Sequence, residues 1–215
     1  MATSSAKVIL FGEHFVVHGS YGIAAAIPKH ISVEVSQIKE VIVDTQKLDI
    51  TYNSQQVKES SNLYAAATAI LKHLNINKHL KIEITSEVRG SGLGSSAAFC
   101  VAFTRALNEK FDLNMESYHI NEAAYAGECS FHGTPSGIDN TICCYEGMIL
   151  FWKEMHTMIS KGNGIKAGFT DKPLSEQYSN TELKFKEIET QNKIKLIIVD
   201  TGKKHETHKM VERVR

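Results

Sequence analysis

A glycine-rich segment at residues 90–96 is the part of the sequence with the clearest chemical potential. It reads Gly90-Ser91-Gly92-Leu93-Gly94-Ser95-Ser96 and runs directly into a helix-forming sequence. Glycines permit positive φ and bring backbone N–H groups close to an anion, and the positive end of the following helix points to the same place. The segment therefore predicts a phosphate-binding loop. A tight turn with Ser95 or Ser96 as the helix N-cap explains it equally well.

Three charged residues elsewhere could take part in phosphate chemistry, although each also has an ordinary structural interpretation. Asp139 follows Ser136 at the S-x-x-D spacing of a capping box, and from these residues alone helix capping is the favoured interpretation. Glu128 lies among small helix-forming residues, where a glutamate is usually solvated, and Lys7 stands at the start of an expected strand. Phosphoryl transfer needs a bound triphosphate, a Mg²⁺ ion and a group that orients the accepting hydroxyl.

The segments that would position these residues show both strand and helix patterns. Strands are predicted at 7–11, 22–27, 31–38, 41–44, 48–52 and 80–86, the last from its alternation of apolar and polar residues. Apolar residues at helical spacing predict helices at 60–74, 96–111 and 116–131. A further strand is expected at 194–199 and the start of a helix at 206–215. This order of elements predicts an α+β fold.

A change in composition suggests two domains. The segment 153–193 is polar, contains Gly162, Gly164, Gly168 and Pro173, and has weak periodicity. We therefore expect an N-terminal domain at 1–170 and the start of a second domain at 171–215.

Composition excludes several classes of protein. The 215 residues are 42% hydrophobic and carry 24 basic and 24 acidic side chains, so no net charge attracts the chain to nucleic acid or to an anionic membrane. No apolar run approaches the roughly 18 residues of a membrane helix, and the first residues do not resemble a signal peptide, so a cytoplasmic location is expected. The cysteines lack C-x-x-C spacing, which predicts reduced, mostly buried thiols: Cys100, Cys129, Cys143 and Cys144.

Three segments together resemble the GHMP kinases, and within that family the mevalonate kinases. They are Lys7-Val8-Ile9-Leu10-Phe11-Gly12-Glu13-His14 with Val16-Val17-His18-Gly19, the glycine-rich segment, and His132-Gly133-Thr134-Pro135-Ser136-Gly137-Ile138-Asp139-Asn140. The resemblance implies the two-layer fold shared with ribosomal protein S5 domain 2. It also implies transfer of the γ-phosphoryl group of ATP, with Mg²⁺, to the 5-hydroxyl of mevalonate, a small-molecule substrate of isoprenoid synthesis.

The resemblance also implies a role for each candidate residue. The backbone of Gly90, Ser91, Gly92, Leu93, Gly94, Ser95 and Ser96 would bind ATP. Ser96 and Glu128 match the Mg²⁺ ligands of the family, and Asp139 matches its catalytic carboxylate. Lys7 matches a lysine placed beside that carboxylate, where its positive charge would favour the developing alkoxide. The acceptor substrate would lie near Glu13, His14, Thr134 and Ser136.

The chain also departs from the family pattern. Ser4-Ser5-Ala6-Lys7 replaces the usual Ala-Pro-Gly-Lys, and Val88 replaces a proline before the glycine-rich segment. The family's third glycine-rich motif has no counterpart, so the chain is expected to be truncated and, alone, much less active than an extended version. Two alternatives stay open: a sister kinase for phosphomevalonate, galactose or homoserine, and a non-catalytic fragment or metabolite-binding regulator. The oligomeric state also stays open, a homodimer included.

Overall fold

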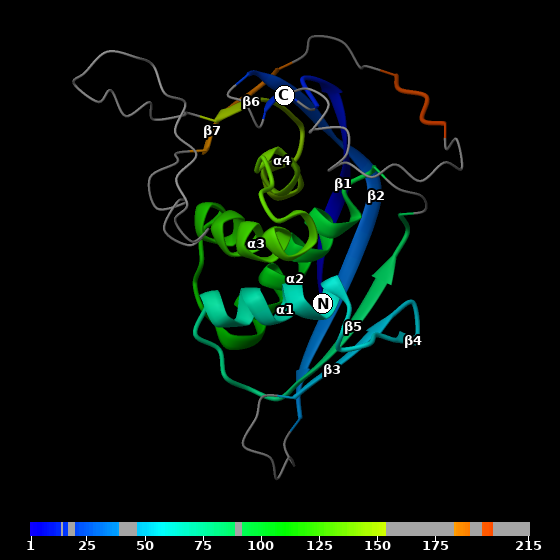
Figure 1. Ribbon diagram of the computed structural model, residues 1–215, viewed down its shortest axis with the longest axis vertical. Helices are drawn as coiled ribbons and strands as arrows, with labels where there is room; N and C mark the ends of the chain where they lie inside the picture. Colours follow the sequence, from blue (N-terminus) through cyan, green and yellow to red (C-terminus); the bar gives the residue numbers. More distant parts are fainter. Residues whose placement is uncertain are drawn as a thin grey trace, which may run out of the picture.

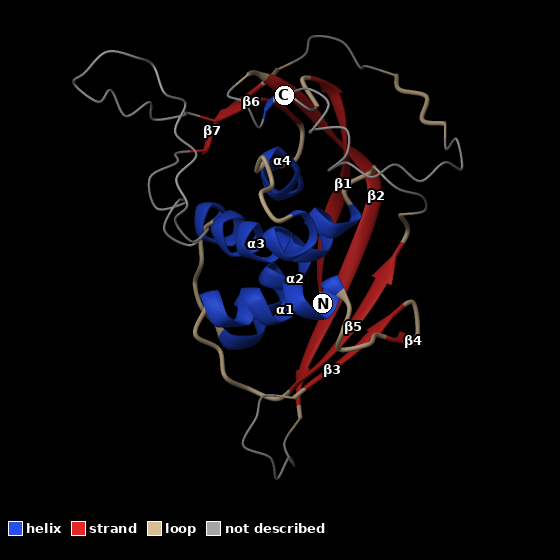
Figure 2. Cartoon of the chain, in the orientation of Figure 1, coloured by secondary structure: helices blue, strands red, loops and turns tan. Residues whose placement is uncertain are grey.

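One mixed β-sheet and a layer of helices make up the described part of the chain. The computed structural model describes residues 1–13, 15–16, 20–38, 47–88, 92–153, 183–189 and 195–199. Its helices are α1 (Asn62–His73), α2 (Ser95–Phe111), α3 (Ser117–His132) and α4 (Ile138–Tyr145). Its strands are β1 (Ala2–Phe11), β2 (Gly22–Gln37), β3 (Leu48–Tyr52), β4 (Gln55–Gln56), β5 (Leu80–Ser86), β6 (Met148–Lys153) and β7 (Leu183–Glu187). The helices cover one face of the sheet (Figures 1 and 2). This arrangement confirms the α+β prediction.

The long strand β2 organises the sheet. The strand order is β4-β3-β5-β2-β6-β7, and β1 also pairs with β2. A strand has only two hydrogen-bonding edges, and β1 occupies one of them from Ile23 to Val33. On the other edge, β5 pairs with residues 31–37 of β2 and β6 pairs with residues 22–25. The two strands therefore lie one after the other along the same edge of β2.

Pro28 lies inside β2, where the sequence predicts a break between two strands. The prediction of two strands is wrong, because the chain continues as one strand through an irregularity. Along β1, Ser5 pairs with His30 and the next residue, Ala6, pairs with Ile27. Pro28 and Lys29 are thus left out of the ladder, and a proline without an N–H is tolerated at such a bulge.

The core lies between the sheet and α2. The inward residues of β5 are buried as its alternation predicts, and α2 buries ten residues from Ala97 to Leu107. The helix α1 begins after Ser61, whose hydroxyl accepts a hydrogen bond from Tyr64 N at 3.2 Å. A second, smaller cluster lies beneath α4 and consists of Val16, Ala24, Ile138, Ile142, Ile149 and Phe151. Burial of this apolar face seats α4 against β2 and β6.

The predicted helices form within one or two residues of their expected bounds, but α4, β4, β6 and β7 have no counterpart in the sequence prediction. β7 lies within the segment predicted as a domain boundary and pairs with β6, while the division into two domains stays a prediction. The strand predicted at 194–199 is wrong for the part that is described. Residues 195–199 have no regular secondary structure, and Ile197 is 92% exposed, because no described strand pairs with them. The elements predicted at 41–44 and 206–215 lie outside the described residues.

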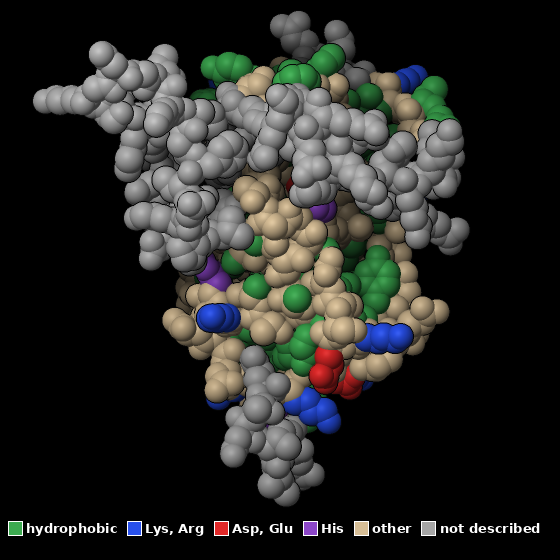
Figure 3. Space-filling view, viewed as in Figure 1, with side chains coloured by type: hydrophobic (Ala, Val, Ile, Leu, Met, Phe, Trp, Pro, Cys, Tyr) green, Lys and Arg blue, Asp and Glu red, His purple; other side chains and the backbone are tan. Residues whose placement is uncertain are grey.

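The surface and the cysteines agree with the composition. On the face that Figure 3 shows, basic side chains form small separate groups among the described residues. Cys100, Cys143 and Cys144 are buried free thiols and Cys129 is partly buried, as predicted. None of the described helices combines the length and apolar character that a membrane span requires.

Candidate active site

The described part of the glycine-rich segment leads into the N-terminus of α2. Gly94 is the N-cap in the left-handed conformation, with φ 73°, and the first helical bond runs from Ala98 N to Gly94 O at 2.9 Å. The interpretation of Ser95 or Ser96 as the N-cap is therefore wrong, since the cap residue has no side chain. Without a side-chain cap, the first amides of α2 remain available to an anion. Gly90 and Ser91 lie outside the described residues.

Lys7 on β1 lies directly against this segment. Its backbone N–H donates to Leu93 O at 2.9 Å. A Cβ added at Gly94 would lie 2.6 Å from Lys7 Cγ and 2.7 Å from Lys7 Cε. Only glycine therefore fits where the loop crosses the lysine side chain, so the packing of the loop fixes the position of the lysine.

Lys7 and Asp139 form an ion pair in which Lys7 Nζ lies 2.9 Å from Asp139 Oδ1. Lys7 is 4% exposed. Burial by itself lowers the pKa of Lys7, but the charge of Asp139 and the hydrogen bond to it outweigh that effect, so that the pKa is raised above the usual lysine value. The charge of Glu13 acts in the same direction. The lysine therefore stays protonated despite its burial.

Asp139 lies in the first turn of α4, and it does not belong to a capping box. The N-cap of α4 is Gly137, at φ 92°, and Ser136 Oγ accepts a hydrogen bond from Ile138 N at 3.3 Å. The predicted S-x-x-D capping role of Asp139 is thus wrong, and its side chain pairs with Lys7 instead.

Buried amides between α3 and α4 support this first turn, a feature that the sequence analysis missed. Asn140 Nδ2 donates to Asn121 Oδ1 at 2.6 Å, and Asn121 Nδ2 donates to Thr141 Oγ1 at 3.2 Å. Thr141 Oγ1 in turn donates to Gly137 O at 2.7 Å. Because an unpaired buried polar group is costly, this network fixes α4 on α3.

Glu128 on α3 is a buried carboxylate next to the same loop. It is 0% exposed, and neither of its oxygens has a hydrogen-bond partner among the described residues. Burial raises the pKa of Glu128 to about 8; the charge of Asp139 adds to the rise, and the neighbouring Ser96 hydroxyl and Lys7 oppose it. The carboxyl is therefore mostly protonated at neutral pH, and a cation bound beside it would favour the ionised form.

His132 connects the two candidate metal ligands and was also missed. Its Nε2 lies 3.3 Å from Ser96 Oγ and 3.8 Å from Glu128 Oε2. Partial burial and the charge of Lys7 lower the pKa of His132 against the opposing effect of Asp139, which favours a neutral ring. Its spacing of four residues from Glu128 on one helix is the signal that could have found it.

The residues expected near the acceptor substrate are less well defined. Glu13 and Thr134 are both exposed, and the Thr134 N–H donates to His132 O at 2.8 Å. His14 lies outside the described residues. The structure brings the side chains of four predicted site residues together: Lys7, Asp139, Ser96 and Glu128. Glu13 is close enough to raise the pKa of Lys7.

Comparisons with known proteins agree with the predicted resemblance. Residues 61–148 match the family model described as GHMP kinases N terminal domain. Mevalonate kinase from Pyrococcus furiosus is 34% identical over 172 residues, which cover 71% of this chain and 52% of that protein. Mevalonate kinase from Archaeoglobus fulgidus is 37% identical over 161 residues, with coverage of 70% and 52%. Residues 61–148 of this chain are thus matched as the N-terminal domain of a GHMP kinase.

Solved structures show the same likeness in three dimensions. The crystal structure of L. major mevalonate kinase in complex with R-mevalonate aligns with a TM-score of 0.58 and 36% identity. The alignment covers 70% of this chain and 48% of that one. The chain therefore spans about half the length of the relatives it matches.

The GHMP kinase resemblance implies Mg²⁺, and the side chains present fit a magnesium ion. Mg²⁺ prefers hard oxygen ligands and takes only one or two from the protein beside phosphate and water. Glu128 offers two buried oxygens that have no hydrogen-bond partner among the described residues, and Ser96 offers a hydroxyl on the neighbouring helix. In the part of the chain that the structure describes, no group of three or more His, Cys, Asp or Glu side chains is arranged to hold a metal ion by itself.

The buried Glu128 carboxyl should make the stability of this chain depend on pH. Its pKa is about 8 when folded, against 4.5 as the ordinary value, so the folded state holds a proton that the unfolded state releases between these pH values. The free energy of unfolding of the metal-free chain should therefore fall as pH rises from 5 to 8. Glu128→Gln should remove this decline. The difference between the melting temperature of the variant and that of the wild type should therefore increase with pH. Glu122→Gln, an exposed change on the same helix, is the control; equal slopes in all three proteins would contradict the buried carboxyl.

Proposed function

We propose that this chain provides the ATP-binding part and the catalytic pair of a mevalonate kinase. The observation that carries the proposal is the ion pair of the buried Lys7 with Asp139 against Gly94, next to the buried Glu128 carboxyl, whose oxygens have no hydrogen-bond partner among the described residues. A purely structural role explains the ion pair, but it does not explain a fully buried acid beside the pair. The mevalonate kinases among the relatives support this choice of activity.

In this mechanism the chain binds the triphosphate and activates the accepting hydroxyl. The glycine-rich loop and the first amides of α2 would bind phosphate oxygens. Asp139 would orient the hydroxyl of the acceptor and take its proton as the oxygen attacks the γ-phosphorus and the bond to the leaving ADP oxygen breaks. Lys7 would hold Asp139 in place and stabilise the negative charge that develops on the attacking oxygen. Ser96 and Glu128 would hold Mg²⁺, which when bound neutralises charge on the phosphates.

Mevalonate is the acceptor that we propose, with Glu13, His14, Thr134 and Ser136 near it. The solved L. major relative was crystallised with R-mevalonate, which supports this acceptor over those of the sister kinases. We further propose that the enzyme works in the cytoplasm, where both substrates are dissolved.

A substrate panel tests this function. The chain is incubated with Mg·ATP and mevalonate, phosphomevalonate, galactose or homoserine, both alone and joined to the C-terminal half of the Pyrococcus furiosus relative, and ADP release is measured. We expect mevalonate to give the highest kcat/KM, and the joined protein to exceed the chain alone. Activity with another acceptor would reassign the substrate. Failure of the folded chain to bind Mg·ATP in calorimetry would contradict the kinase proposal itself.

The proposed metal ligands lead to a separate prediction. Ser96→Ala and Glu128→Gln should each raise the Mg²⁺ concentration needed for half-maximal activity, by about tenfold, because each removes an oxygen from a site with few protein ligands. Paramagnetic resonance of Mn²⁺ with a non-hydrolysable ATP analogue measures the same loss without turnover. Glu122→Gln serves as the control on α3. Unchanged metal affinity in both variants would exclude these residues as ligands.

A further inference from the structure

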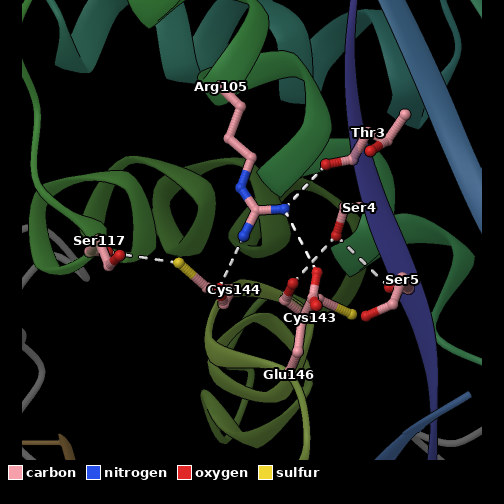
Figure 4. Close-up of polar contacts among 8 residues, drawn as sticks. All are labelled: Thr3, Ser4, Ser5, Arg105, Ser117, Cys143, Cys144 and Glu146. Atoms are coloured by element: carbon pink, nitrogen blue, oxygen red, sulfur yellow. Dashed lines mark hydrogen bonds and ion pairs between the residues drawn. The ribbon is translucent and has the colours of Figure 1, made fainter.

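The side chain of Arg105, a residue of α2, contacts β1 and the C-terminal end of α4, whereas Asp139 lies at the N-terminal end of α4. Its Nη1 donates to Thr3 O on β1 at 2.8 Å, and its Nη2 donates to Cys144 O in the last turn of α4 at 2.7 Å (Figure 4). Glu146, which follows α4, places Oε1 3.7 Å from the guanidinium. The residue itself belongs to α2, so one side chain ties α2, β1 and α4 together.

Ser4 adds a second link between the same strand and helix. The Ser4 hydroxyl, 1% exposed, donates to Cys143 O at 3.1 Å (Figure 4). The last carbonyls of a helix have no partners within the helix, and its C-terminal end carries partial negative charge. Arg105 and Ser4 therefore satisfy two such carbonyls of α4, and the positive guanidinium also offsets the charge at that end.

The strand β1, which Arg105 contacts and to which Ser4 belongs, also carries Lys7, and the helix α4, which both side chains contact, carries Asp139. α4 has eight residues and is about 12 Å long, so it behaves as a short rigid rod. One end is held to β1 by the Lys7–Asp139 ion pair, and the other by the links at Thr3 and Ser4. If the second end were released, α4 could pivot on its apolar cluster and change the approach of Asp139 to Lys7.

We propose that Arg105 is a positioning residue that, with Ser4, holds Asp139 opposite Lys7 by fixing the C-terminal end of α4 to β1. The planar guanidinium suits this role because its donors have a fixed spacing, and it bridges two carbonyls at once. A lysine has a single nitrogen on a flexible chain and cannot hold both at the same separation. An effect of Arg105 on the rate of phosphoryl transfer rests on the proposed function, whereas its effect on the position of Asp139 relative to Lys7 does not.

The geometric consequence is tested on the 215-residue chain by NMR at constant pH. The protein is labelled at lysine ¹³Cε, and the Lys7 resonance is assigned by its disappearance in Lys7→Met. Its displacement in Asp139→Asn defines the effect of losing the ion pair. We expect Arg105→Met to displace the Lys7 resonance by about half of that amount or more, and Ser4→Ala to displace it by less. Arg105→Lys should give a displacement between those of Arg105→Met and Ser4→Ala, because it retains one of the two donor positions. Lys110→Met, the matched change at an exposed site on α2, should leave it in place.

The catalytic consequence is tested in the joined protein that is used for the substrate panel. A misplacement of about 1 Å in a catalytic group can cost as much as about 100-fold in rate, so we expect Arg105→Met to lower kcat by about tenfold or more while KM for ATP stays within about twofold. An Arg105→Met chain that folds with an unmoved Lys7 resonance would overturn the proposal. If Arg105→Met does not fold, Arg105→Lys and Ser4→Ala decide it by the same resonance. A moved resonance in a protein without kinase activity would uphold the positioning role and refute the proposed function.

Discussion

Asp139→Asn should lower the turnover of phosphoryl transfer by about 100-fold or more, while the affinity for Mg·ATP changes by only a few fold. Asparagine keeps the shape of the side chain but cannot accept the proton of the attacking hydroxyl. In the proposed function the nucleotide would be bound elsewhere, by backbone groups of the loop and the start of α2. The measurements are single-turnover kinetics and calorimetric titration with a non-hydrolysable analogue.

Stability must be separated from catalysis in this variant, because it leaves the buried Lys7 without its partner. Removing one member of a buried pair destabilises a protein, so the melting temperature of Asp139→Asn should fall. Lys7→Met combined with Asp139→Asn removes both charges, and this double variant should recover stability without recovering turnover. Asp49→Asn, a carboxylate on the distant strand β3, controls for the chemical change. Near-normal turnover in a folded Asp139→Asn protein would limit Asp139 to a structural role.

Gly94→Ala should lower the affinity for Mg·ATP by about tenfold or more, with a matching loss of stability, because overpacking costs about 1–3 kcal/mol. The new methyl group would lie 2.6 Å from Lys7 Cγ. The lysine cannot move aside easily, since its backbone is bonded to Leu93 O and its Nζ to Asp139. The start of α2, whose amides we propose to bind phosphate, must shift instead.

Gly147→Ala separates the clash from backbone strain. Both glycines have positive φ, 73° at Gly94 and 65° at Gly147, so alanine is strained at either position. Nothing lies within 4 Å of a Cβ added at Gly147. We therefore expect Gly147→Ala to lower stability modestly and to leave nucleotide binding unchanged. Equal effects of the two variants on nucleotide affinity would show that contact with Lys7 is unimportant.

The sequence by itself determined the elements whose signals are local. The alternation at 80–86 predicted β5, and apolar residues at helical spacing predicted α1, α2 and α3, because these periods reflect which face is buried. The three motif segments also predicted the resemblance to the GHMP kinases, which the comparisons confirmed. The sequence did not predict the short elements: α4 has eight residues and β6 has six, which are too few for a periodic pattern of apolar residues to be recognised.

Tertiary structure decided what long-range partners control. Pro28 predicted a break, yet pairing with β1 keeps β2 continuous around a bulge. The spacing of Ser136 and Asp139 favoured a capping box, but Lys7, 132 positions away, takes the carboxylate instead. The roles of His132 and Arg105 depend on groups from other elements, which no local pattern contains. A sequence records the period of each segment, whereas the charge that a buried group meets is set only when distant segments pack together.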